Sequence, residues 1–130
     1  LKKLSIELNY SPVSVTIYGD VNQLQQVFLN MILNAIDATA DGGKIKITTT
    51  GVDDYAQIIF EDTGCGIVPE DLDKIFEPFF TTKSPGKGTG LGLSICYGII
   101  EEHKGKISVS SNGIGKGTAF TISLPIYEKT

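Results

Sequence analysis

The chain has 130 residues, of which 41% are hydrophobic, and its formal net charge is −4 at pH 7. This length and composition predict one globular domain, residues 1–130, with a single core. The acidic balance argues against a nucleic-acid partner, and no apolar run approaches the length of a membrane span. Cys65 and Cys96 lack metal-ligand spacing, so we interpret them as reduced thiols of a cytoplasmic protein. Because the first residue is Leu and not Met, we expect a fragment of a longer chain.

The chain opens with two segments in which apolar and polar residues alternate, 4–8 and 13–18, separated by a Ser11-Pro12 turn. Alternation is typical of half-buried strands, so the opening is predicted to be a strand pair. A helix is predicted from Asp20, a good N-cap, to about Thr39. Apolar residues at helical spacing predict its buried face: Leu24, Val27, Phe28, Met31, Ile32, Ala35 and Ile36.

A second stripe along this helix is polar and rich in amides rather than in Lys and Glu. Asn30 and Asn34 lie one turn apart on it, although Asn is a poor helix former. Two amide carbonyls on one face are able to ligate a hard cation such as Mg²⁺. The alternative interpretation is a solvated face, and the helix alone does not decide between the two.

Two strands joined by a turn at 53–54 are predicted at 44–50 and 55–62. Residues 56, 58, 60 and 62 of the second strand share a face that is apolar until Asp62. A carboxylate that points toward the core needs a partner. Gly64 and Gly66 follow at once and allow a close approach to the backbone. By itself, this pattern favours a simple Asp-Gly turn.

The second half of the chain predicts a short helix at 69–75, a helix from about 90 to 104 that ends at Gly105, and strands at 106–111 and 118–124. A glycine-rich turn at 112–117 joins these strands. Polar and apolar residues alternate in both strands, so one face of the sheet is expected to carry the helices and the other to face water. The fold class predicted is therefore a two-layer α/β sandwich. His103, the single histidine, lies at a helix C-terminus, where a structural role is favoured over phosphate acceptance.

The loop before the last helix carries glycines at 86, 88, 90 and 92. Unshielded backbone N–H groups at a helix start attract anions, and Lys83 and Lys87 add positive charge. This pattern indicates a phosphate-binding lid, with a flexible surface loop as the alternative. No Gly-Lys pair is followed by Ser or Thr, so there is no P-loop, and Ile95 stands where a dinucleotide fingerprint needs a small residue.

Four separated motifs stand in order: Asn30-Met-Ile-Leu-Asn34-Ala35, Asp62-Thr-Gly64-Cys-Gly66, Phe76-Glu-Pro-Phe79-Phe80 and Gly88-Thr-Gly90-Leu-Gly92-Leu. Together they resemble the N, G1, F and G2 boxes of the catalytic ATP-binding domain of sensor histidine kinases, within the ATPase group that includes gyrase and the heat-shock chaperones. The run at 76–94 is similar to the nitrogen-regulation type. The resemblance covers about residues 4–125 and implies a Bergerat-type fold, a mixed sheet covered by helices on one face.

The resemblance also implies that the domain binds ATP or ADP with Mg²⁺. It implies that Asn34 is the metal ligand and that Asn30 helps to hold the metal and the phosphates. It also implies that Asp62 accepts a hydrogen bond from the adenine amino group and that Thr118 supports Asp62. The predicted catalytic residues are Asn30, Asn34 and Lys83. The predicted cofactor-binding residues are Asn34, Asp62, Gly64, Gly66, Ile67, Phe79, Lys83, Lys87, Gly88, Thr89, Gly90, Leu91, Gly92 and Thr118.

The chain departs from the family pattern at two points. Asp37 stands where many histidine kinases carry Lys, so Lys83 or Lys87 is expected to take over that phosphate contact. His103 is followed by Lys104 and not by an acidic residue, so it does not match the family's phosphate acceptor. The resemblance therefore implies an acceptor His on an upstream dimerisation domain of the same kinase, a homodimeric parent protein and, indirectly, a response regulator.

Two other functions stay open at this stage. A gyrase-like ATP hydrolase needs a Glu at the position of Asn30 to orient water, and an amide is a poor base, so this residue favours the kinase. A nucleotide-binding module without chemistry remains open for the isolated fragment.

Overall fold

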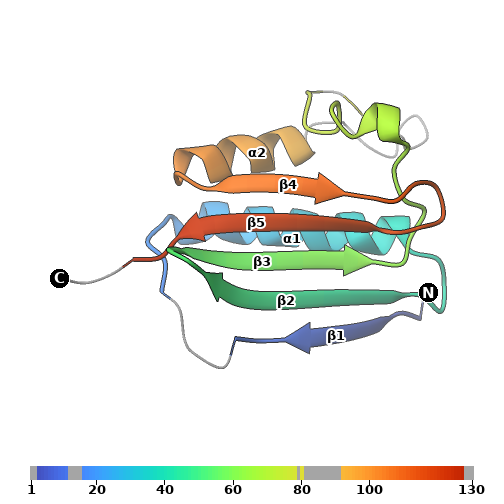
Figure 1. Ribbon diagram of the computed structural model, residues 1–130, viewed down its shortest axis with the longest axis horizontal. Helices are drawn as coiled ribbons and strands as arrows, with labels where there is room; N and C mark the ends of the chain where they lie inside the picture. The colour runs from blue at the N-terminus through green and yellow to red at the C-terminus, as the bar shows by residue number, and fades with distance from the viewer. Residues whose placement is uncertain (1–2, 12–15, 79, 81–91, 128–130) are drawn as a thin grey trace.

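The structure is a computed structural model that describes residues 3–11, 16–78, 80 and 92–127. Five strands form one mixed sheet in the order β1-β2-β3-β5-β4, and the helices α1 and α2 pack on one of its faces (Figure 1). All neighbouring strands are antiparallel except β1 and β2, which are parallel. The elements are β1 (Ser5–Asn9), α1 (Val21–Ala38), β2 (Lys44–Val52), β3 (Tyr55–Asp62), the 3₁₀-helix η1 (Pro69–Asp71), α2 (Gly92–Glu102), β4 (Lys106–Ser110) and β5 (Thr118–Pro125).

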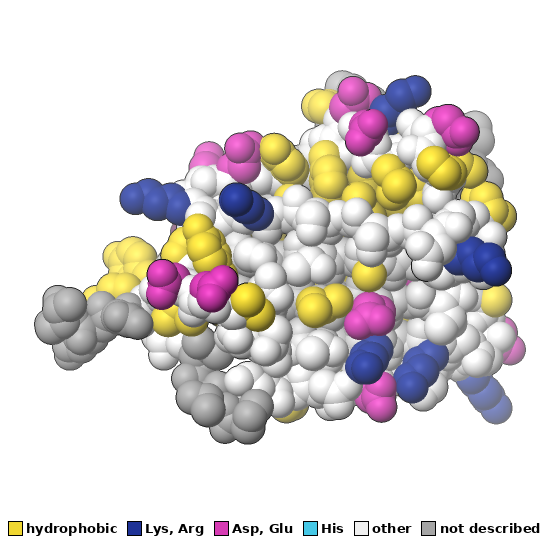
Figure 2. Space-filling view, viewed as in Figure 1, with side chains coloured by type: hydrophobic (Ala, Val, Ile, Leu, Met, Phe, Trp, Pro, Cys, Tyr) yellow, Lys and Arg dark blue, Asp and Glu magenta, His cyan; other side chains and the backbone are white. Residues whose placement is uncertain are grey.

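This architecture confirms the predicted two-layer α/β sandwich. Along β5, Phe120, Ile122 and Leu124 are buried, and the residues between them are only partly buried. The buried set meets the apolar faces of both helices in one core cluster. Figure 2 looks onto the other face of the sheet, where hydrophobic side chains cover only a small part of the surface. Within the described ranges, no helix combines the length and hydrophobicity that crossing a bilayer requires.

The first helix forms where the sequence predicts it. The Asp20 side chain accepts a hydrogen bond from the backbone N–H of Gln23 at 2.9 Å, which satisfies one of the free donors at the helix start. Met31 lies on the buried face and is 1% exposed. At the other end, the Thr39 hydroxyl donates to the carbonyl oxygen of Ala35 at 2.6 Å. These hydrogen bonds fix where α1 begins and ends, and so fix the position of Asn30 and Asn34 along the helix.

The end of α2 differs in detail from the expectation that Gly105 stops the helix. The left-handed residue is Lys104, with φ of 61°, and the N–H of Gly105 donates to the carbonyl oxygen of Ile100 at 2.9 Å. This is the hydrogen bond of a Schellman motif. Gly105 is needed for another reason, because a Cβ there would lie 2.4 Å from the carbonyl oxygen of Ser123.

Two of the predicted elements are wrong. The opening is not a strand pair: β1 pairs with β2, and within 13–18 the described residues 16–18 contribute a single bridge from Ile17 to Ile126. The register of β1 sets Ile6 opposite Ile45, so both side chains lie on the helix face. The expected helix at 69–75 is the short 3₁₀-helix η1, followed by turns with i→i+3 hydrogen bonds, because this segment buries only Ile75 against the core.

Candidate functional site

Asp62 is the last residue of β3 and lies opposite Thr118, the first residue of β5. Because cross-strand partners point to the same side of a sheet, both side chains face the helix layer, as the alternation predicts. Thr118 is 8% exposed and Asp62 is partly buried. The strand register therefore brings together the two residues that the sequence singled out from segments more than fifty positions apart.

Backbone donors hold the Asp62 carboxylate. The N–H of Gly64 donates to Oδ1 at 2.8 Å, and the backbone N–H of Thr118 also hydrogen-bonds the carboxylate. Burial raises the pKa of Asp62 above its ordinary value of 3.8, although these two hydrogen bonds act in the opposite direction. No ion pair joins Asp62 to any residue that the structure describes. A carboxylate oriented in this way is suited to accept a hydrogen bond from a ligand amine.

Two positions in the loop after Asp62 have room for glycine only. A Cβ at Gly64 would lie 2.4 Å from the carbonyl oxygen of Ala38, at the end of α1. Gly66 has φ of 74°, and its Cβ would lie 2.0 Å from the carbonyl oxygen of Gly113. The N–H of Cys65 donates to the Ala38 carbonyl oxygen at 3.0 Å. The loop is thus pressed between α1 and the turn that precedes β5, which keeps its backbone close to Asp62.

Asn30 and Asn34 lie in the half of α1 that leads toward Ala38, and both are partly buried. The side-chain amide of Asn30 donates to Sγ of Cys96 in α2 at 3.5 Å. Burial raises the pKa of the Cys96 thiol, so it stays protonated at neutral pH. In the described part of the chain, no hydrogen bond joins the Asn34 side chain to another residue. Amide oxygens of this kind fit Mg²⁺, which usually keeps waters and takes few protein ligands.

Several predicted site residues lie outside the described residues: Phe79, Lys83, Lys87, Gly88, Thr89, Gly90 and Leu91. Gly92 is described as the first residue of α2, and a Cβ there would lie 4.0 Å from the Asn30 amide nitrogen. Of the aromatic motif, Phe76 packs against Tyr97 and Phe120 with centroid distances of 5.5 and 6.3 Å. The start of α2 therefore lies next to the asparagine face of α1.

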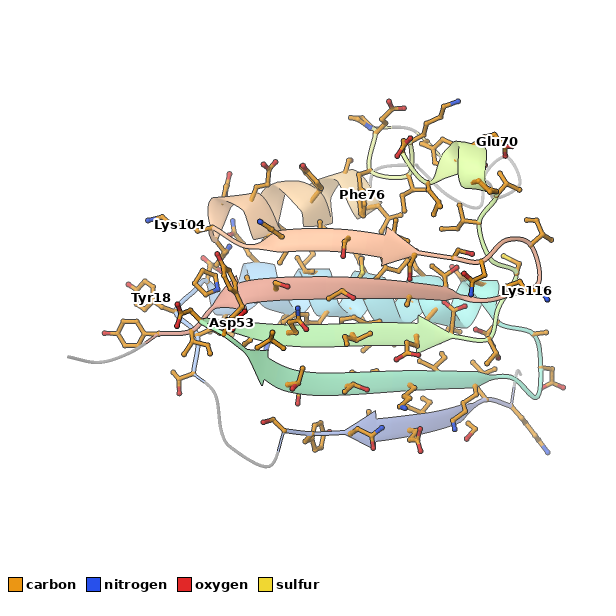
Figure 3. The ribbon with its side chains drawn as sticks, viewed as in Figure 1. Tyr18, Asp53, Glu70, Phe76, Lys104 and Lys116 are labelled. Atoms are coloured by element: carbon orange, nitrogen blue, oxygen red, sulfur yellow. The ribbon has the colours of Figure 1, made fainter. Side chains whose placement is uncertain are left out.

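His103 lies at the opposite end of the sheet from Asp62. Its Nδ1 lies 2.8 Å from the carbonyl oxygen of Ile99, and its Nε2 accepts from the backbone N–H of Asp20 at 3.0 Å. A cavity of about 720 Å³ opens there, beside Tyr18 and Tyr127; Tyr18 marks this end in Figure 3. With both ring nitrogens engaged, His103 ties α2 to the start of α1, which agrees with the structural role predicted for it.

The sequence interpretation missed one contributor to the site, the turn at 111–117. Its Gly115 N–H donates to the carbonyl oxygen of Cys65 at 2.7 Å, and its Gly117 N–H donates to that of Gly64 at 3.2 Å. The spacing of Gly113, Gly115 and Gly117 predicts a turn. It does not predict which other segment of the chain the turn contacts. In Figure 3, Lys116 of this turn lies at the end of the sheet where β3 ends and β5 begins.

The structure is an α/β sandwich that places Asp62, Thr118 and a glycine-containing loop together at one end of its sheet. Residues 19–128 match the model of the histidine kinase-, DNA gyrase B- and HSP90-like ATPase family. The chain belongs to this family of nucleotide-binding ATPase domains, which confirms the family resemblance. The nitrogen-regulation subtype stays a prediction.

The curated relatives of this chain include sporulation and sensor kinases. The chain is 44% identical over 129 residues to sporulation kinase E of Bacillus subtilis (strain 168), covering 98% of this chain and 17% of that protein. It is 41% identical over 139 residues to sensor kinase CckA of Brucella abortus (strain 2308), covering 95% of this chain and 15% of that protein. The chain thus spans less than a fifth of the length of either protein.

Solved structures agree in fold. The catalytic domain of histidine kinase ThkA superposes with a TM-score of 0.82 at 37% identity, covering 94% of this chain and 80% of that one. Full-length ShkA in complex with AMPPNP superposes with a TM-score of 0.83 at 29% identity, covering 98% of this chain and 26% of that one. The domain is therefore of the histidine kinase type within its family.

Proposed function

We propose that this domain binds Mg-ATP and presents the γ-phosphate to a His on a separate phosphoacceptor domain of the same protein. The observation that carries the proposal is the Asp62 carboxylate, which faces the helix layer beside Thr118 and accepts a hydrogen bond from the Gly64 backbone. Membership of the ATPase family and the likeness to a histidine kinase catalytic domain support it. A dimeric parent, a response regulator and a cytoplasmic location belong to the same proposal.

Each residue has a role in this proposal. Asp62 accepts a hydrogen bond from the adenine amino group, Thr118 supports that carboxylate, and the loop containing Gly64, Gly66 and Ile67 forms the pocket wall. Asn34 ligates Mg²⁺ and Asn30 helps to hold the phosphates. When bound, Mg²⁺ neutralises charge on the phosphates. The predicted lid residues, among them Lys83 and Lys87, contact the phosphates from the other side.

An ATP hydrolase is the second candidate function, and Asn30 counts against it. The Asn30 amide donates to Cys96, so the amide nitrogen is directed toward α2. Neither end of an amide acts as a base at neutral pH. Transfer of the γ-phosphate to a His on another domain, unlike hydrolysis, does not require a base on α1.

We expect Asn34→Ala to weaken Mg-ATP binding about tenfold or more while changing the affinity for Mg-free ADP less than twofold. The reason is that the substitution removes a metal ligand and leaves the adenine pocket intact. Calorimetric titration of both nucleotides measures the difference. Gln26→Ala, an exposed change on the same helix, is the control and should alter neither affinity. Equal losses for both nucleotides would show that Asn34 has a structural role.

We expect the isolated domain to remain unlabelled by radioactive ATP and to label its cognate phosphoacceptor domain when the two are mixed. The ring nitrogens of the single histidine are engaged with Ile99 and Asp20, so it is not available to accept phosphate. A phosphohistidine assay on gels measures both reactions.

The control for this experiment is His103→Gln, which should label the acceptor domain nearly as fast as the wild type. Label on the isolated wild-type domain that vanished in this variant would contradict the assignment of His103. A mixture that releases phosphate without labelling the acceptor would instead favour the hydrolase.

A further inference from the structure

The turn at 111–117 is a sequence feature to which the proposed function gives no role. It contains Gly113, Gly115 and Gly117, all with positive φ, and it leads directly into Thr118. Its backbone N–H groups donate to the carbonyl oxygens of Gly64 and Cys65. The turn therefore lies against the loop that forms one side of the candidate adenine site.

The Ser111 side chain, at the start of this turn, joins the loop after Asp62 to the end of the turn. The backbone N–H of Ile67 donates to Oγ of Ser111 at 2.9 Å, and the Ser111 hydroxyl donates to the carbonyl oxygen of Gly117 at 2.7 Å. The N–H of Gly113 also approaches Oγ at 3.3 Å. A hydroxyl has one donor and two acceptor positions, so these contacts use its full capacity.

Both backbone segments joined by Ser111 belong to the site. Gly117 lies directly against Asp62, since a Cβ at Gly117 would be 2.2 Å from the Asp62 carbonyl oxygen. Ile67, on the other segment, packs partly buried against the core and is a predicted cofactor-binding residue. The Ser111 hydroxyl is thus the side-chain link between the wall at Ile67 and the strand pair that carries Asp62 and Thr118.

We propose that Ser111 is a positioning residue for the adenine side of the nucleotide site, because its hydroxyl holds Ile67 in register with Asp62 and Thr118. The inference rests on the proposed function, since it assumes that adenine occupies this pocket. It assigns no contact between Ser111 and the nucleotide. Loss of the hydroxyl leaves the Ile67 N–H without its partner and frees the loop to move away from Asp62.

The first experiment compares Ser111→Ala with the wild type in titrations with ADP and with Mg-ATP. We expect both dissociation constants to rise by the same factor, about five- to thirtyfold, because one partly buried hydroxyl links two backbone groups on the base side. Amide hydrogen exchange at Ile67 should accelerate in the free protein. Ser110→Ala, an exposed change on the adjacent residue of β4, is the matched control and should leave both constants unchanged.

A second pair of variants separates the hydroxyl from side-chain shape and from folding. Ser111→Thr and Ser111→Val have nearly the same shape and differ in the hydroxyl. We expect the Thr variant to bind ADP at least five times more tightly than the Val variant. This comparison decides the question even if Ser111→Ala does not fold.

Three results would overturn the proposal. The first is a dissociation constant for ADP in Ser111→Ala that lies within twofold of that in Ser110→Ala. The second is a loss of affinity in Ser111→Ala for Mg-ATP but not for ADP. The third is an equal affinity for ADP in Ser111→Thr and Ser111→Val. In each case wild-type binding of ADP would still support the proposed function. A wild-type domain that binds neither ADP nor Mg-ATP would overturn the proposed function itself.

Discussion

Asp62→Asn is expected to lower the affinity for ADP and ATP about ten- to a hundredfold. The substituted amide keeps an oxygen for the Gly64 N–H, but it loses the negative charge and places an N–H₂ group toward the adenine amine. Loss of a hydrogen bond to a charged group costs about 1.5–3 kcal/mol, which corresponds to this range. Titration with either nucleotide measures the effect. ATP affinity within twofold of the wild type would remove Asp62 from the adenine site.

The same variant should not lose stability. Burial raises the pKa of Asp62 in the folded protein, so the native state favours the protonated acid. The corresponding stabilisation is fully present below the unfolded-state pKa and is lost as the pH rises through the folded-state pKa. At pH 7 the ionised group therefore lowers stability, and Asp62→Asn should unfold at a temperature no lower than the wild type. ADP affinity of the wild type should fall on acidification, starting at a higher pH than an ordinary Asp would give.

Glu61→Gln is the matched control for both measurements. Glu61 precedes Asp62 on β3, points to the opposite face of the sheet and is exposed. The control removes the same charge from the same strand end, so it should bind ADP as the wild type does. A loss of affinity in Glu61→Gln equal to that in Asp62→Asn would indicate a general effect of net charge.

Gly66→Ala is expected to reduce the free energy of unfolding by about 3 kcal/mol or more and to weaken ADP binding at least tenfold. Two effects add at this position. A residue with a side chain is strained at φ of 74°, and the new Cβ would lie 2.0 Å from the backbone oxygen of Gly113, which has no flexible end to move. The loop must therefore shift away from the turn. Denaturant unfolding and ADP titration measure the two consequences.

Gly115→Ala separates these two effects. Gly115 has a similar φ of 78°, but a Cβ there would meet nothing within 4 Å. Its variant should lose only about 1–2 kcal/mol, the cost of the left-handed backbone. Equal destabilisation by the two variants would mean that the close approach of Gly66 to the Gly113 carbonyl oxygen has no energetic weight.

Local patterns were sufficient for most of the fold. Alternation located β3 and β5, and helical spacing with the Asp20 cap located α1, because these signals come from residues near one another in the sequence. The same alternation placed Asp62 and Thr118 on the helix face, and the strand register confirms this. The opening and the segment after Pro69 were predicted wrongly, since β1 pairs with a strand that follows α1 and since only one residue of 69–75 is deeply buried.

Periodicity and motif spacing are local properties, so they were enough to predict the sandwich, the family resemblance and the carboxylate at the end of β3. Which distant backbone segments touch became apparent only in the folded chain. The tertiary structure joined Asn30 to Cys96, His103 to the start of α1, and Ser111 to the loop after Asp62. These contacts depend on strand order and helix packing, which arise from burial of the whole core, and no pattern within one segment encodes them.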